Sequence, residues 1–322
     1  MSEQPNSYLI DDIKNGMLRE GVQHVSSLLT AEDLHRARTE VLDFYYRELD
    51  AGLFFTADEA KKLDLFSAMS SHSRRVERSN NLMHSSMAWF SKSESFERLS
   101  KVMQSLVGPD LDMFLARVIV TVPLDHIPSY IREIYDPMKN KLHGSINKFL
   151  RNEILRAFFF IHNPWHQDWV DMPSSDLRFF TTLIPLTDRL NGQAPLYVMP
   201  CSAAIEPLPL PIPHSENDVE VTLEDGPVPR VLEKRRINAK AGDLICWPAR
   251  TFHKVEPNTA EEPAINLRFN FSPAGARTGL NDMSNLVPIS RSILSRLVES
   301  GPTDPGSPQY VSCDHLELKV AR

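Results

Sequence analysis

Two histidines and one aspartate have the residue types of a metal site. His166 and Asp168 are separated by Gln167 alone, and His253 follows much later in the chain. Two imidazoles and one carboxylate can hold one face of an Fe(II) ion and leave its other coordination positions open. A co-substrate and dioxygen could bind together at such an ion, so the set predicts oxidation chemistry at iron.

The pair His166 and Asp168 is a weak signal by itself, because about one such match is expected by chance in a chain with 11 histidines. His214 and His315 also have an acidic residue two positions later, but His214 lies in a proline-rich stretch and His315 near the C-terminus. His166 follows a strongly apolar run at 158–161. Alternate residues of an extended segment share a face, so both side chains can point at one ion. A hydrogen-bonded pair at a strand end remains the alternative.

His253 lies beyond an apolar segment at 244–247 that follows the turn residues Gly242 and Asp243. A strand end, or the turn after it, could place His253 beside His166. An ordinary surface or core histidine is the alternative when His253 is considered alone.

Arg268 stands in a segment, 264–272, whose residues alternate between apolar and polar. Ile265, Leu267, Phe269 and Phe271 share one face, and Asn266, Arg268 and Asn270 share the other. Such an arginine usually faces solvent, but inside a barrel it would face the cavity and need an anionic partner. The carboxylate of a small keto acid could supply that partner through a bidentate pair.

The composition is that of an ordinary globular protein, with 42% hydrophobic and 24% charged residues. A formal net charge of −7 gives no overall attraction to nucleic acid or to anionic membranes. Three widely spaced cysteines show no disulfide or metal-binding pattern, and no apolar run approaches the length of a membrane span. We therefore expect a cytoplasmic protein that binds neither nucleic acid nor membranes.

The order of expected elements indicates a β-rich core with helices at its flanks. Helices are expected after Thr30, with Asp33 in the capping-box position, and at 95–107, before Gly108 and Pro109. The expected strands are 113–122, 155–162, 177–186, 195–199, 230–237, 243–247 and 264–271. Many short strands between turns are typical of a β-sandwich or barrel.

Three regions follow from this order. Residues 1–110 are expected to be helical and to pack on the core. Residues 111–285 would form the core, with an insertion at 124–152 and a proline-rich loop at 204–229. Residues 286–322 would hold a helix, at 289–299, and an irregular tail.

Together these motifs resemble the Fe(II)- and 2-oxoglutarate-dependent dioxygenases, and most closely the phytanoyl-CoA dioxygenase-like family. The resemblance covers most of the chain, with long divergent stretches. The segments that carry it are 17–22, 28–30, His166-Gln167-Asp168, 191–200, Gly242-Asp243, His253, Pro257-Asn258 and Arg268. It implies a double-stranded β-helix, also called a jelly roll or cupin-like core.

The resemblance also implies roles for individual residues. His166, Asp168 and His253 would hold Fe(II), and Arg268 would bind the distal carboxylate of 2-oxoglutarate. Thr181 or Thr182 would add a hydroxyl contact to this co-substrate, depending on the strand register, and Gln167 is placed in the same group. The reaction implied is hydroxylation, or another oxidation, of an unactivated C–H bond with O2, releasing succinate and CO2.

The sequence departs from the family pattern at several positions. Cys201 follows Pro200 where members commonly have Pro-Gly-Ser-His, Lys254 replaces a frequent glycine, and the gap from His253 to Arg268 is slightly long. These differences concern the pocket and the substrate. Members that halogenate replace the metal-binding carboxylate by a small residue, so the presence of Asp168 favours hydroxylation.

The candidate substrate residues are Trp165, Trp169, His143 and Asn163. A cupin-like metal enzyme that does not use 2-oxoglutarate and a protein or peptide hydroxylase remain the alternatives to an oxygenase acting on a small metabolite.

Overall fold

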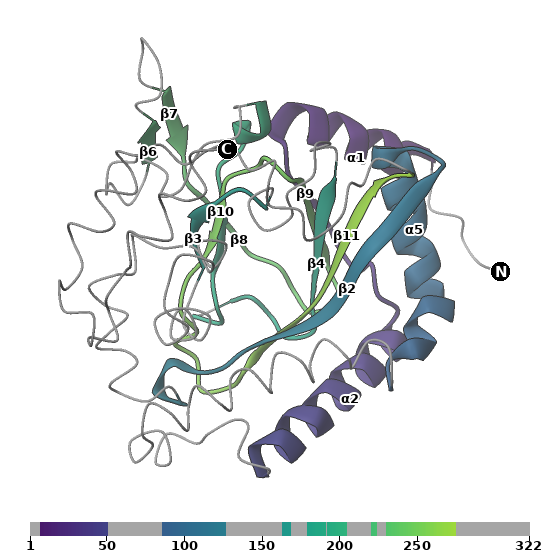
Figure 1. The fold of residues 1–322 in the computed structure, drawn as a ribbon, viewed down its shortest axis with the longest axis vertical. Helices are drawn as coiled ribbons and strands as arrows, with labels where there is room; N and C mark the ends of the chain where they lie inside the picture. The colour runs from purple at the N-terminus through teal and green to yellow at the C-terminus, as the bar shows by residue number, and fades with distance from the viewer. Residues whose placement is uncertain are drawn as a thin grey trace, which may run out of the picture.

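A computed structural model describes residues 7–50, 86–126, 163–168, 179–190, 192–204, 220–223 and 230–274 of the chain. The predicted helix at 289–299, the strand at 155–162, and most of the insertion at 124–152 lie outside these residues. The described residues form two antiparallel sheets of five and four strands, a separate pair of antiparallel strands, and helices on one side (Figure 1).

The larger sheet has five strands in the order β1–β9–β4–β11–β2. Their bounds are Gln23–Val25 (β1), Leu244–Pro248 (β9), Phe180–Pro185 (β4), Ala264–Pro273 (β11) and Leu111–Thr121 (β2). The smaller sheet has the order β3–β10–β5–β8, with Asn163–His166 (β3), His253–Val255 (β10), Leu196–Val198 (β5) and Arg235–Ile237 (β8). Strands far apart in sequence alternate between the sheets, which confirms the predicted double-stranded β-helix.

Apolar side chains from both sheets meet between them and form the inner core. The cluster consists of Val22, Leu183, Leu196, Val198, Ile237, Ala239, Ile245 and Trp247. Ile119 of β2 and Val255 of β10 pack against it. The polar residues that share this inner face are therefore surrounded by apolar walls.

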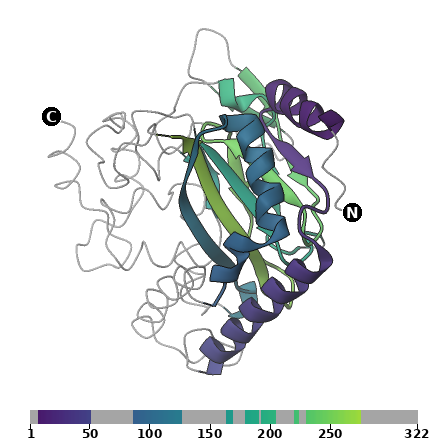
Figure 2. The same ribbon diagram turned by 90° about the vertical axis from the view of Figure 1, so that its right-hand side faces the viewer.

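Helices cover the outer face of the larger sheet. They are α1 (Ser7–Glu20), α2 (Ala31–Asp50) and α5 (Glu94–Val107), with a short 3-10 helix at Ala88–Lys92 before α5. α5 packs against β11 and β2 (Figure 2). Phe90 stacks on Phe269 of β11 with ring centroids 5.7 Å apart, so the apolar face of β11 points toward the helices. Among the described helices, none has the length and apolar character needed to cross a membrane.

The N-cap of α2 differs from the predicted capping box. The Thr30 hydroxyl accepts the backbone N–H of Asp33, as expected. The Asp33 carboxylate does not complete the box, because it accepts the N–H and the hydroxyl of Ser95 at the start of α5. Asp33 therefore joins two helices, and Ser95 in turn accepts the N–H of Thr30.

Three sequence-based expectations are corrected by the structure. Residues 1–110 are not wholly helical, because β1 extends the larger sheet beside β9. The strand expected at 230–237 is two strands, since Arg230–Glu233 (β7) pairs with Glu220–Leu223 (β6) whereas β8 pairs with β5. β6 lies within the range 204–229 that was expected to be loop. A 3-10 turn at Leu124–His126 begins the predicted insertion.

Gly242 and Asp243 form the turn that leads into β9. Gly242 has a φ of +88°, which favours glycine. The Asp243 carboxylate accepts hydrogen bonds from the N–H groups of Ser27 and Lys240 and from His24 Nε2. Burial opposes ionisation of Asp243, but these hydrogen bonds outweigh it and lower the pKa of this carboxyl. The turn thereby fixes β1 and the start of β9.

We expect Asp243→Asn to destabilise the protein at pH 7 by about 1–3 kcal/mol, because the amide has only one accepting oxygen for three donors. A carboxyl whose pKa is lowered by folding stabilises the folded state above its unfolded pKa of about 3.9. That stabilisation is lost as the pH falls through the folded-state pKa. Urea unfolding should therefore show a difference from wild type at pH 7 that shrinks below pH 4. Asp11→Asn, at an exposed position of α1, is the control; equal stabilities at pH 7 would contradict the assigned role.

Candidate metal centre

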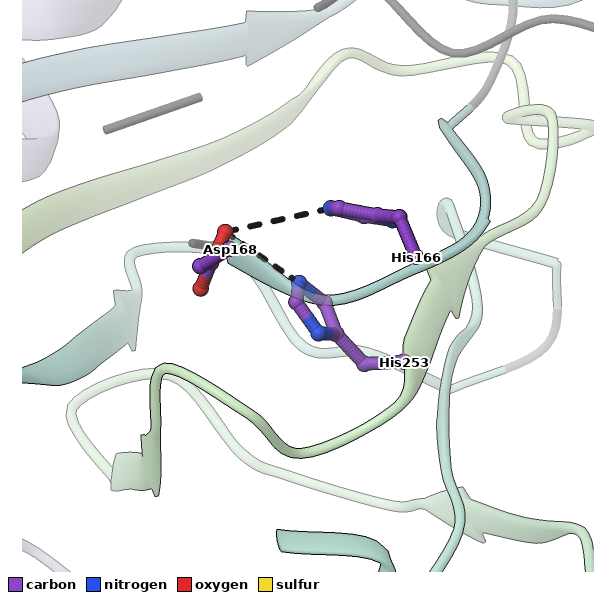
Figure 3. Close-up of side chains that lie close together, drawn as sticks. All are labelled: His166, Asp168 and His253. Atoms are coloured by element: carbon purple, nitrogen blue, oxygen red, sulfur yellow. Dashed lines mark ion pairs between the residues drawn. The ribbon is translucent and has the colours of Figure 1, made fainter. Parts of the chain in front are cut away.

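The structure brings His166, Asp168 and His253 together inside the β-helix. His166 ends β3 and lies opposite His253 of β10, and their ring centroids are 4.1 Å apart. Asp168 follows two residues later, with Oδ1 3.8 Å from His166 Nε2 and 3.6 Å from His253 Nε2 (Figure 3). One ligand atom from each residue lies within 4.8 Å of the others, and all three residues are buried.

The carboxylate of Asp168 is held by three neighbours from the larger sheet. Oδ2 accepts the hydroxyl of Thr181 at 2.6 Å and the indole N–H of Trp247 at 3.0 Å. Oδ1 lies 2.7 Å from Nη2 of Arg268. Burial by itself would raise the pKa of Asp168, but the charge of Arg268, followed by the nearby histidines, holds this pKa well below its usual range. Asp168 is therefore an anion in a fixed orientation.

The two histidine-bearing segments are fixed by backbone carbonyl groups. His253 Nδ1 lies 3.0 Å from the carbonyl oxygen of Thr251. Since a carbonyl only accepts, Nδ1 donates its proton to this oxygen, and Nε2 is the ring nitrogen that faces Asp168. Gln167 points away from the other two residues of its motif and donates to the carbonyl of Arg250 at 2.8 Å. The structure thus places Gln167 where it joins the β3 end to the loop before β10.

These residues fit a divalent transition metal. Two imidazoles and one carboxylate that bind one face of the ion are the ligand set of non-haem Fe(II) sites. The remaining coordination positions of such an ion stay open. Within the described part of the chain, no other cluster of three histidine, cysteine or acidic side chains has this arrangement. Cys246 does not take part, and burial raises the pKa of its thiol to about 12.

The predicted alternation of β11 is confirmed, since its polar face points between the sheets. Arg268 lies opposite Leu183 of β4, and Leu183 belongs to the inner core. The guanidinium is buried and also donates from Nε to Asn270 Oδ1 at 3.3 Å. The expectation that a buried Arg268 needs an anion is met here by Asp168.

The strand register decides which threonine of β4 faces the metal centre. Thr181 lies opposite Asn270 on one side and Trp247 on the other, and its hydroxyl reaches Asp168. Thr182 points the opposite way and donates to the carbonyl of Phe269. Thr181 is therefore the threonine near the site, and Thr182 holds β4 to β11.

The candidate substrate residues are only partly within the described structure. Trp165 is buried, and the ammonium of Lys254 lies 5.5 Å from its ring centroid. Asn163 begins β3 opposite Val255. His143 and Trp169 lie outside the described residues.

Sequence reasoning did not assign the groups that hold Asp168 or those that shape the loop between β10 and β11. Trp247 donates its indole N–H directly to Asp168. Asn258 uses its amide to hold the carbonyls of Thr121 and Glu262. The resemblance had marked Asn258, but its role depends on contacts between distant segments that no local pattern reveals.

Comparison with known proteins places this fold. No protein-family model matches the sequence, and no curated protein does. Among solved structures the chain is similar to the non-heme alpha-ketoglutarate-dependent epimerase SnoN from nogalamycin biosynthesis, with a TM-score of 0.52 and 13% identity over 95% of this chain and 96% of SnoN. The chain has the fold of SnoN.

Two further similar structures have TM-scores just below 0.5. The alpha-ketoglutarate-dependent carbocyclase SnoK, from the same biosynthesis, has a TM-score of 0.48 and 14% identity over 94% of this chain and 92% of SnoK. EvdO2 from Micromonospora carbonacea, complexed with 2-oxoglutarate, has a TM-score of 0.49 and 12% identity over 87% of this chain and 95% of EvdO2. At these identities the similarity is one of fold.

Proposed function

We propose that the chain is an Fe(II)- and 2-oxoglutarate-dependent oxygenase that oxidises a C–H bond of a small molecule. The observation that carries this proposal is the buried cluster of His166, Asp168 and His253 in a double-stranded β-helix, with Arg268 beside it. The cluster supplies three protein ligands and leaves room in the coordination sphere for a co-substrate.

His166, Asp168 and His253 would hold the iron. When bound, iron would couple the reduction of O2 to the oxidative decarboxylation of 2-oxoglutarate. One oxygen atom of O2 enters succinate, CO2 is released, and the other oxygen atom is transferred to the substrate. Thr181 and Trp247 position the Asp168 carboxylate, and Arg268 supplies positive charge for a carboxylate of the co-substrate. The apolar core around these residues excludes water, which strengthens each of these interactions.

Hydroxylation is the reaction that the ligand set supports best. A halogenating site needs a coordination position for halide in place of the carboxylate, and Asp168 fills that position here. The resemblance to the phytanoyl-CoA dioxygenase-like family supports the same choice. A small molecule is the proposed substrate, because SnoN is a small-molecule enzyme of the same fold, in complex with nogalamycin RO in a second structure.

The direct test is an anaerobic titration of the protein with Fe(II), with and without 2-oxoglutarate. We expect a weak visible absorption band only when both are present, because the keto acid must chelate the iron. Asp168→Ala should abolish the band, and succinate release can then be used to screen substrates. Iron binding without any such band would favour a cupin-like metal enzyme that does not use 2-oxoglutarate.

A further inference from the structure

Arg189 is a buried cation outside the metal centre. It follows β4 in the turn before β5, and only 2% of its surface is exposed. Its Nε donates to Asn266 Oδ1 at 3.0 Å and its Nη1 donates to the carbonyl of Ala194 at 2.6 Å. No carboxylate of the described residues pairs with it. Burial lowers the pKa of Arg189 to about 10, so it stays charged at neutral pH.

A buried guanidinium that lacks an anion is costly, and two hydrogen bonds to neutral oxygens compensate for only part of its lost hydration. The guanidinium has five N–H donors, and these two bonds use two of them. The remaining donors and the uncompensated charge suit a carboxylate ligand.

Asn266 adds a second donor at the same place. It is 1% exposed, and its Nδ2 is a buried nitrogen with no hydrogen-bond partner. The amide cannot be turned around, because Arg189 only donates and must face the amide oxygen. Asn266 therefore presents an unpaired N–H2 group next to an unneutralised guanidinium. Unpaired buried donors are rare in folded proteins and call for an unseen partner.

These two donors lie on the same inner face as the metal centre, farther along β11. Asn266 lies opposite Ile119, which packs on the inner core, so its side chain points between the sheets. The inward-facing polar residues of β11 follow one another in the order Asn270, Arg268, Asn266. Asn270 is level with the metal centre, because it lies opposite Thr181, which contacts Asp168. Alternate residues of a strand are about 6.7 Å apart. Arg268 leans back toward Asp168 and Asn270, whereas Asn266 leans toward Arg189.

We propose that Arg189 and Asn266 bind the distal carboxylate of the keto-acid co-substrate, while Arg268 serves the end next to the metal. A five-carbon dicarboxylate whose keto-acid end is at the triad has to place its other carboxylate some distance along the inner face, and Arg189 supplies a cation there. The long spacing from His253 to Arg268 fits this division, since the arginine on β11 pairs with Asp168. The inference rests on the proposed function. It assigns the selectivity for a dicarboxylate to Arg189 and Asn266 in place of Arg268.

The test compares two keto acids on the full-length protein loaded anaerobically with Fe(II). 2-Oxopentanoate has the length of 2-oxoglutarate but lacks its distal carboxylate. Isothermal titration should show that Arg189→Met weakens 2-oxoglutarate binding about 100-fold and leaves 2-oxopentanoate within about threefold. Arg268→Met should weaken both keto acids alike. A purely structural role of Arg189 would weaken both ligands equally in the Arg189→Met variant, which would overturn the proposal.

Asn266→Asp tests the same site without removing the buried cation. The new carboxylate would neutralise Arg189 and repel the ligand, so the variant should unfold at or above the wild-type temperature and lose its preference for 2-oxoglutarate. This variant decides the matter if Arg189→Met does not fold, and Asn266→Ala controls for loss of the amide. Full preference for 2-oxoglutarate in Asn266→Asp would overturn the proposal.

The two hypotheses fail in different ways. A wild-type protein that binds Fe(II) but neither keto acid would contradict the proposed function itself. A wild type that prefers 2-oxoglutarate, with a preference that survives Arg189→Met and disappears in Arg268→Met, would leave the function standing and assign the distal carboxylate to Arg268.

Discussion

Asp168→Ala is expected to abolish Fe(II) binding and, with it, turnover. Asp168 supplies the only anionic ligand of the triad, and its orientation is fixed by Thr181, Trp247 and Arg268. Removing it leaves two imidazoles and no anion beside a buried guanidinium, whose charge repels a divalent ion. The loss should exceed the roughly 10- to 100-fold decrease that changes outside the ligand set typically cause.

Anaerobic titration calorimetry with Fe(II) measures this effect in a series of variants. Thr181→Val keeps the carboxylate but removes one of its hydrogen bonds, so we expect a loss within the roughly 10- to 100-fold range. His35→Ala, an exposed histidine of α2, should leave metal binding unchanged. His253→Ala should lose Fe(II) affinity as Asp168→Ala does, because it also removes a metal ligand. Wild-type metal affinity in Asp168→Ala would remove the basis of the proposed metal centre.

The parts of the site that could be predicted from sequence are those set by local periodicity. Alternation along a strand places Arg268 on the face opposite Phe269, and the structure confirms both directions. The same rule puts His166 and Asp168 on one side of their segment and Gln167 on the other. Side chains alternate between the two faces of any strand, whatever its neighbours are. The directions of these side chains can therefore be predicted without knowing the partner strands.

The parts that could not be predicted depend on register and on contacts between distant segments. Thr181 and Thr182 are adjacent and equally apolar in context, and only the pairing of β4 with β9 and β11 decides between them. β1 has three residues, too few for a periodic signal, and it is a strand because β9 offers it an edge. Asp33 fits a capping box, yet its carboxylate accepts hydrogen bonds from Ser95 of another helix and not from the N-cap backbone.

Arg189 is the most consequential residue that sequence reasoning missed. It stands in a turn, where a charged residue is ordinarily exposed, and no pattern around it indicates burial. Its position follows from the turn itself, in which Thr187 accepts the N–H of Ile265 and Arg189 reaches Asn266. The turn is thereby held against the first residues of β11. This contact between distant segments buries the guanidinium of Arg189.

Arg268→Met is expected to change metal binding and keto-acid binding in opposite directions. Arg268 Nη2 lies 2.7 Å from Asp168 Oδ1, so a metal ion has to compete with the guanidinium for this carboxylate. Without Arg268 the ion meets no competing cation, and Fe(II) should bind more tightly. Keto-acid binding should weaken, because the co-substrate loses a positive partner in an apolar surrounding.

The stability of the same variant should depend on the metal. Removing one partner of a buried ion pair leaves an uncompensated charge and costs about 3–5 kcal/mol, so metal-free Arg268→Met should unfold more easily than wild type. An ion at the triad neutralises Asp168 in place of the guanidinium and should restore most of this loss. Urea unfolding of wild type and variant, with EDTA and with saturating Mn(II), measures both effects, and Arg38→Met at an exposed position of α2 is the control.

The signs of these effects separate a competing ion pair from general structural support. If Arg268 only supported the fold, its loss would weaken metal and keto acid together, and Mn(II) would stabilise both proteins equally. If it balances Asp168 until the ion arrives, metal affinity rises, keto-acid affinity falls, and the ion stabilises the variant more than the wild type. Arg268→Lys keeps the charge but loses the planar fork, so it should preserve the stability of the metal-free protein better than its affinity for the keto acid.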